Sequence, residues 1–255
     1  MEKEYFKYRF TNDITFNLDI GDFVCIMGNC NDLFLHTLLN GHKKCNIFIG
    51  DKELNEENKF EIRKRMSIVL YKHLDIFVGE TVRDEIAFGL ESLGKTKDDI
   101  NESITSLARE FRLTDLLDRD CYSLGSSDKV KMKILEAIIT EPKIIVLDNV
   151  MCELDYSDKV LVFNALKDFK KSGGIVINLT NDIEEALYSD KMIIIYDKKL
   201  ITIGKTLSVL NEEKILKRLG IGLPFIIDLN RYFMDYGMVN KYYLNYDKLV
   251  GALWK

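Results

Sequence analysis

The sequence predicts a three-layer α/β fold with a mostly parallel central sheet. Ile144 to Leu147 form an apolar run between Pro142 and Asp148, which is typical of a strand buried on both faces. Strand and helix patterns alternate along most of the chain, and this order favours helices that cover a parallel sheet. The 255 residues are enough for one large α/β domain and a small additional unit.

The first half of the chain begins with a predicted hairpin. Apolar residues alternate with polar ones from Ile14 to Ile20, and a second strand, Phe23 to Met27, follows the turn at Gly21 and Asp22. We expect this hairpin to form an antiparallel edge of the fold. A helix is then predicted between Gly28 and the stop signal Asn40-Gly41. Further strands are expected within residues 46–54 and 66–70, a helix within 81–90, and one or two amphipathic helices within 97–119.

The second half continues the same alternation. Ser123 to Ser127 form a polar turn before a predicted helix at 128–139, and the central strand follows. Helices are then expected around 159–170, 182–188 and 211–219, with strands at 175–179, 191–196 and 200–203. From Gly220 onward the chain carries Pro224 and much of its aromatic content, which indicates a small separate helical unit.

Composition excludes several classes of function. The net charge is -5 and no basic block dominates any region, which argues against a nucleic-acid partner. The longest apolar stretches, such as Met192 to Tyr196, are far shorter than the ~20 residues of a membrane span, and the N-terminus has no signal-peptide core. Any membrane role is therefore expected to depend on a partner. The cysteines are odd in number and lack C-x-x-C spacing, so we expect reduced, cytosolic thiols; the scattered histidines, His36, His42 and His73, argue against a histidine metal site.

Asp148 follows the central strand directly. Ligands of open α/β sheets bind at the carboxyl ends of the strands, and a carboxylate at that position can hold a magnesium ion beside a nucleotide phosphate. A core strand that ends in an ordinary turn aspartate explains this segment equally well. The rest of the chain favours the ligand interpretation.

Several blocks of sequence resemble one family, in its order and with its spacing. They are IRKRMSIVL at 62–70, FVGETVRDEIAFGLESLG at 77–94, EPKIIVLD at 141–148, LTNDIEEA at 179–186 and the final LVGALWK. From about Tyr8 to Lys255 the chain resembles the nucleotide-binding subunits of ATP-binding cassette (ABC) transporters of the energy-coupling factor (ECF) type, which drive vitamin and metal-ion uptake. The resemblance implies a P-loop NTPase cassette at 1–210, a helical subdomain near 72–135 and a C-terminal dimerisation unit at 211–255.

The phosphate loop departs from the family pattern G-x-x-x-x-G-K-[ST], in which glycines and a lysine surround the phosphates. Gly28 is retained, but the positions five to seven residues later are Leu33, Phe34 and Leu35. Alignment from Asn40-Gly41 indicates instead that two residues are deleted, and neither register supplies a lysine. We expect Phe34 to fill the phosphate pocket. The degenerate loop comprises Gly28, Asn29, Cys30, Asn31 and Asp32.

The catalytic motifs also differ from the family pattern, and each difference removes a functional group. By resemblance, Tyr71 replaces the glutamine that senses magnesium and the transmembrane partner, and Asn149 replaces the glutamate that orients the attacking water. An amide cannot accept that proton at neutral pH. Asn181 replaces the switch histidine and cannot carry its charge. The signature L-S-G-G-Q, which caps the partner's bound γ-phosphate, is represented by Leu124, Gly125, Ser126, Ser127 and Asp128.

Three family positions are retained. They are Asp148 for magnesium, Asp155 in the loop that crosses the dimer interface, and Tyr8 as the aromatic residue that stacks on adenine. One lost residue is compatible with a working site, and loss of a general base alone costs roughly 10²-fold to 10⁴-fold in rate. Five losses in one chain predict that hydrolysis by its own motifs has gone while the fold and the partner-facing surfaces remain.

These observations predict a catalytically deficient subunit of an ECF-type importer at the cytoplasmic face of the membrane. Its expected partners are an intact second ATPase subunit in a heterodimer, a transmembrane coupling subunit and a substrate-binding membrane protein, with ATP and magnesium as the family's cofactors. Two alternatives remain open at this stage. One is an active ATPase with an unorthodox phosphate loop, and the other is a scaffold that has kept the cassette fold without a transporter.

Overall fold

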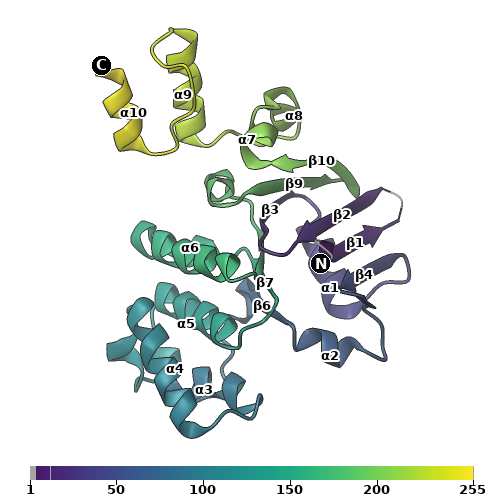
Figure 1. The fold of residues 1–255 in the computed structure, drawn as a ribbon, viewed down its shortest axis with the longest axis vertical. Coiled ribbons are helices and arrows are strands. Elements are labelled where there is room, and N and C mark those ends of the chain that lie inside the picture. The colour runs from purple at the N-terminus through teal and green to yellow at the C-terminus, as the bar shows by residue number, and fades with distance from the viewer. Residues whose placement is uncertain (1–3, 12, 255) are drawn as a thin grey trace.

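The computed structural model, which describes residues 4–11 and 13–254, contains two β-sheets flanked by helices (Figure 1). The larger sheet has six strands in the order β10-β9-β3-β8-β7-β6, and β10 alone runs antiparallel to its neighbour. Its strands are β3 (Phe23–Gly28), β6 (Met66–Leu70), β7 (Ile144–Asp148), β8 (Ile175–Leu179), β9 (Lys191–Tyr196) and β10 (Lys199–Lys205). The predicted three-layer P-loop NTPase fold is confirmed.

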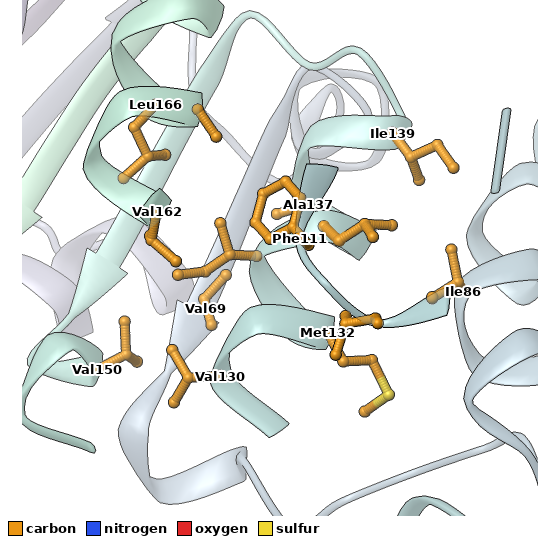
Figure 2. Packing of buried hydrophobic residues seen from close by; sticks show 14 of the residues in the cluster. Val69, Ile86, Phe111, Val130, Met132, Ala137, Ile139, Val150, Val162 and Leu166 are labelled. Carbon is orange, nitrogen blue, oxygen red and sulfur yellow. The ribbon is translucent and has the colours of Figure 1, made fainter. Parts of the chain in front are cut away.

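Strand β7 shows why this sheet lies in the middle of the fold. Ile145 and Leu147 pack into the core beneath helices α5 (Ser126–Ile139) and α6 (Tyr156–Lys171). Ile144 and Val146 belong to the core on the opposite face. Successive side chains of a strand point to opposite faces, so a strand covered on both sides must be apolar at every position. Figure 2 shows the first of these cores, in which Val130 and Ala137 of α5 and Val162 and Leu166 of α6 surround Val69 of β6.

The opposite face of the central sheet is covered by a second sheet and helix α1 (Asn31–Asn40) (Figure 1). This sheet has the order β2-β1-β4-β5 and is antiparallel throughout. Its strands are β1 (Glu4–Phe10), β2 (Ile14–Asp19), β4 (Cys45–Ile49) and β5 (Lys52–Glu53). The short helix α2 (Lys59–Arg63) leads from it to β6.

The predicted hairpin between Ile14–Ile20 and Phe23–Met27 is wrong. Strand β2 pairs with β1, whereas β3 pairs with β8 and β9 in the other sheet, so the turn at Gly21 carries the chain between sheets. The burial patterns give the reason. Inward and outward positions alternate along β2, as expected for a sheet with one covered face, while β3 is buried from Phe23 to Met27 and suits the centre of a parallel sheet.

A helical region follows β6 and lies on the α5 side of the sheet. It contains α3 (Val82–Glu91), α4 (Lys97–Glu110) and short 3-10 turns at Tyr71–His73, Thr114–Leu116 and Cys121–Ser123. The side chain of Thr81 caps α3 and exchanges hydrogen bonds with Asp84 in a capping box. Two further 3-10 segments, Val150–Glu153 and Ile183–Tyr188, follow β7 and β8; the second was predicted as a helix.

The C-terminal part is helical and packs on the edge of the central sheet. It contains α7 (Thr206–Leu210), α8 (Glu213–Arg218), α9 (Phe225–Asp235) and α10 (Tyr246–Leu253). Leu216, Ile227 and Leu249 share one apolar cluster with Met27 of β3 and Ile194 of β9. The division at residues 210 and 211 stays a prediction. No helix within residues 4–11 and 13–254 is long and apolar enough to cross a bilayer.

The two-sided burial of β7 predicts a large stability difference between two isoleucine substitutions. Ile145→Ala removes a fully buried side chain and should lower the free energy of unfolding by about 2–5 kcal/mol through lost burial and the cavity left behind. Ile203→Ala on β10 removes a side chain that is 42% exposed and should cost much less. Equilibrium urea denaturation of both variants provides the measurement, and equal losses would contradict this account of the core.

Candidate functional site

The carboxyl ends of the central strands bring most of the predicted catalytic positions together. Asp148 at the end of β7 lies in register with Leu179 at the end of β8, and the backbone N–H of Asn149 donates to the Leu179 carbonyl at 2.9 Å. Asn181 follows two residues later, and Tyr71 follows the end of β6, which pairs with β7. The topology therefore places Tyr71, Asp148, Asn149 and Asn181 along one edge of the sheet.

Asp148 is half-buried beside a second carboxylate. Burial raises the pKa of the Asp148 carboxyl, the charge of Asp32 in the first turn of α1 raises it further, and Lys72 opposes both effects. No three acidic, histidine or cysteine side chains within the described residues are grouped so that they could hold a metal ion. A magnesium ion at Asp148 would therefore need phosphate oxygens and water for its remaining ligands.

The segment between β3 and α1 is very short. Gly28 ends β3 and Asn31 begins α1, so two residues, Asn29 and Cys30, make the whole connection. Gly28 has a φ of +129°, and a Cβ at this position would lie 1.9 Å from the carbonyl oxygen of Ile195 on β9. Only glycine fits such a conformation and such a close approach.

Both connecting residues are hydrogen bonded to the turn between β9 and β10. Asn29 Nδ2 donates to Asp197 Oδ1 at 2.8 Å, and the N–H of Asp197 donates to Asn29 Oδ1 at 2.8 Å. The N–H of Lys198 donates to Cys30 Sγ at 3.2 Å. These side chains are therefore engaged within the protein instead of pointing to a ligand.

The start of α1 offers little to a triphosphate. Its N-cap, Cys30, makes no side-chain capping bond, and Asp32 adds a negative charge to the first turn. No residue from Gly28 to Asn40 is a lysine. Asn31 Oδ1 is buried without a hydrogen-bond partner, but it is an acceptor and cannot donate to phosphate. This loop therefore lacks the lysine with which the family pattern binds phosphate.

Two aromatic residues lie elsewhere than the sequence predicted. Phe34 is 1% exposed, and its ring centre lies 4.8 Å from that of Tyr8, beneath the antiparallel sheet. The expectation that Phe34 fills the phosphate pocket is therefore wrong, because the helix turns this side chain into the core. Tyr8 is also 1% exposed, its ring stacks on Phe16, and its hydroxyl is hydrogen bonded to Thr37 Oγ1 at 2.9 Å. It leaves no ring face for adenine, which corrects the expected stacking role.

The positions that replace catalytic residues make contacts of their own. Tyr71 is 43% exposed, and its hydrogen bond to Glu153, together with the charge of that carboxylate, raises the pKa of the phenol. Asn149 has a left-handed backbone with φ of 51°, and its Nδ2 points to Cys152 Sγ at 3.9 Å. Asn181 is exposed. The replacing side chains themselves, a phenol and two amides, include neither a carboxylate nor an imidazole that could act as a general base.

The polar turn at the start of α5 is held by α6. The helix begins at Ser126, and its N-cap Gly125 makes no side-chain capping bond. Ser127 Oγ donates to Asp158 Oδ2 at 2.6 Å, and Lys131 bridges Asp128 at 2.8 Å and Asp158 at 3.0 Å. Burial alone would lower the pKa of Lys131, but its hydrogen bonds to the two carboxylates and their charges raise it.

The loop before α6 ends in its own cap. Asp155 Oδ1 accepts the N–H of Asp158 at 2.8 Å, and this backbone donor lowers the pKa of the Asp155 carboxyl. The sequence indicated Asp155 and the Gly125 to Asp128 turn as candidates, and Asp158 and Lys131, which hold that turn, were not among them. A signal for the pair was present, because each charge occupies an inward position of an amphipathic helix.

Comparison with known proteins identifies relatives along nearly the whole chain. The energy-coupling factor transporter ATP-binding protein EcfA1 of Bacillus subtilis is 30% identical over 210 residues, which cover 82% of this chain and 75% of the relative. This chain belongs to the family of ECF transporter ATP-binding proteins. The EcfA1 protein of Mycoplasma pneumoniae is 28% identical over 262 residues, covering 98% of this chain and 94% of that protein. No family model matches the sequence.

Solved structures agree on the fold of this ECF ATP-binding protein. CbiO1 from Clostridium perfringens, described as part of the ABC transporter complex cbiONQ, superposes with a TM-score of 0.73 at 20% identity and covers 90% of this chain and all of CbiO1. An ATP-binding subunit of an ABC transporter superposes with a TM-score of 0.72 at 17% identity, covering 83% and 94% of the two chains. The chain thus has the ABC cassette fold together with a two-residue loop after Gly28.

The close approach of Gly28 to β9 predicts a strong intolerance of any side chain there. Gly28→Ala places a Cβ against the Ile195 carbonyl and keeps an unfavourable φ, so it should lower the free energy of unfolding by more than about 2 kcal/mol. Gly222→Ala is the matched control, because a Cβ there would meet nothing within 4 Å. Thermal unfolding of the two variants decides the point; a Gly28→Ala protein as stable as the control would show that the loop is free to move away.

Proposed function

We propose that this chain is the catalytically deficient nucleotide-binding-domain subunit of an ECF-type ABC importer. It pairs with an intact second ATPase subunit, and the pair drives uptake of a micronutrient such as a vitamin or metal ion. The observation that carries this proposal is the two-residue loop after Gly28. Its side chains are bonded to the β9–β10 turn, and it contains no lysine.

The charges near the loop support weak or absent ATP binding at this chain's own site. Asp32 and Asp148 lie close enough for the charge of one to raise the pKa of the other. Two neighbouring carboxylates repel a triphosphate, whereas a working phosphate loop offers a lysine and backbone donors. Asn149 and Asn181 cannot replace the missing base and switch residue.

In a head-to-tail dimer, this chain would contribute its signature turn to the partner's site, and this turn keeps more of the family's features than the phosphate loop does. The N-terminus of α5 still presents backbone N–H groups at Ser126 and Ser127, which suit a phosphate bound by a partner. Asp155 caps α6 beside that turn. In the proposed heterodimer, hydrolysis takes place at the site formed by the partner's phosphate loop and this chain's signature turn. A homodimer would lack a working loop at both sites.

Two further surfaces are available for partners. The C-terminal helices present exposed aromatic residues, including Tyr236 at 81% and Trp254 at 86%, which supports a dimerisation role for residues 211–255. Next to a cavity of about 320 Å³ between β6 and α5, Ile76 and Val78 are 58% and 67% exposed. We assign this second surface to a transmembrane coupling subunit, which would hold the chain at the cytoplasmic face of the membrane beside a substrate-binding membrane protein.

Nucleotide titration tests the state of the chain's own site. The isolated chain should bind MgATP with a Kd weaker than about 1 mM, because the loop has neither the donors nor the positive charge to hold the phosphates. Isothermal titration calorimetry of this chain and of the isolated partner subunit, as a positive control, makes the measurement. Micromolar binding by this chain, or magnesium-dependent turnover that is lost in Asp148→Ala, would favour an active ATPase instead.

Substitution of the exposed apolar residues tests the membrane partner. Ile76→Glu and Val78→Glu together place two charges on the surface beside the 320 Å³ cavity and should abolish recovery of a multi-span protein with the tagged chain from detergent-solubilised membranes. Phe60→Glu is the control, because Phe60 is 73% exposed on α2, away from this surface. Equal recovery of the membrane protein with all variants would contradict the assignment of this surface. If the wild-type chain were recovered without any membrane protein, a scaffold function would be indicated instead.

A further inference from the structure

We propose that Asp158 is a positioning residue for ATP hydrolysis in the heterodimer, where it fixes the signature turn of this chain against the partner's nucleotide. The inference rests on the proposed function, since it concerns the site that the Gly125 to Asp128 turn completes. Asp158 itself makes no contact with the nucleotide. It acts through Ser127 and Lys131.

The geometry shows that one carboxylate joins two helix starts. Asp158 lies in the first turn of α6, three residues after its N-cap Asp155, and is 7% exposed. A single oxygen, Oδ2, accepts from Ser127 Oγ at 2.6 Å and from Lys131 Nζ at 3.0 Å. Both donors belong to α5. The signature turn and the Asp155 loop, the two segments assigned to the partner interface, are thereby locked in one relative position.

The first turn of α5 depends on this support. The N-cap of α5 is Gly125, which has no side chain to accept a hydrogen bond from the first N–H groups of the helix. The Ser127 hydroxyl donates to Asp158 and is therefore not available to a ligand. A phosphate at this turn would be bound by backbone N–H groups. The direction of these groups follows the direction of α5, which the bonds to α6 hold in place.

Lys131 also controls the charge of the turn. It is 5% exposed and shared between Asp128 and Asp158, so the negative charge of Asp128 is partly neutralised where a triphosphate would approach. Removal of Asp158 would free the Ser127 hydroxyl and leave Lys131 paired with Asp128 alone. Both contacts of these α5 side chains with the Asp158 carboxylate would be lost together. A positioning role predicts that ATP binding weakens when Asp158 is removed. Loss of a negative charge alone predicts the opposite, an improvement in ATP binding.

The experiment uses the purified heterodimer and separates KM for ATP from kcat. Asp158→Ala should raise KM about tenfold, equivalent to ~1.4 kcal/mol, with kcat changed less than about twofold, because the turn binds ground state and transition state alike. Asp158→Asn should restore most of the affinity, since its amide oxygen can accept both bonds. Ser127→Ala, which leaves both ion pairs in place, should raise KM by about threefold. Asp168→Ala, an exposed position on the same helix, is the control.

The outcomes separate this inference from the function on which it rests. If the wild-type heterodimer hydrolyses ATP and Ser126→Trp, which blocks the signature turn, abolishes turnover, the proposed function stands. An unchanged or lowered KM in Asp158→Ala, or an Asp158→Asn complex no better than Asp158→Ala, would then overturn the inference alone. If Asp158→Ala fails to assemble, an unchanged KM in Ser127→Ala overturns it. A heterodimer without ATP turnover would overturn both.

Discussion

The close contact between Gly28 and β9 is the constraint on which the site depends. With Gly28 against the Ile195 carbonyl and Asn29 bonded to Asp197, the chain has two residues in which to leave β3 and begin α1. A connection of two residues is shorter than the phosphate loop of the family pattern G-x-x-x-x-G-K-[ST]. The same region joins the connection after β3 to the β9–β10 turn through the bonds of Asn29 and Cys30.

The losses in this chain are unevenly distributed between its two partner-facing edges. At the strand ends, the family pattern places a base at Asn149 and a switch histidine at Asn181, and the two carboxylates Asp32 and Asp148 interact there. At the start of α5, serines stand where the family's signature has glycines, and the buried side chains of Lys131 and Asp158, together with Ser127, hold the helix start. A network of this kind is costly to bury unless every member has a partner. These contacts support a functional role for the turn in the proposed heterodimer.

Much of the fold followed from the sequence, because apolar periodicity reports burial directly. The run from Ile144 to Leu147 predicted a strand covered on both faces, and β7 is that strand. The partner of β2 could not be predicted in this way, since strand pairing is set by contacts distant in sequence and a Gly-Asp turn serves equally to join strands or to change sheets. Asp148 lies at the end of β7 and Asp155 lies directly before α6, and the site roles expected for both stay predictions. Tyr8 and Phe34 were misplaced, because an aligned position does not reveal whether a side chain points to the ligand or into the core.

The proposed heterodimer would have one functional nucleotide site. Native mass spectrometry of the purified heterodimer with a non-hydrolysable ATP analogue and magnesium measures this directly, because it counts bound nucleotides in each intact complex. The account predicts one nucleotide in each heterodimer at saturation, bound by the partner's phosphate loop and this chain's signature turn. Two nucleotides in each complex would contradict it.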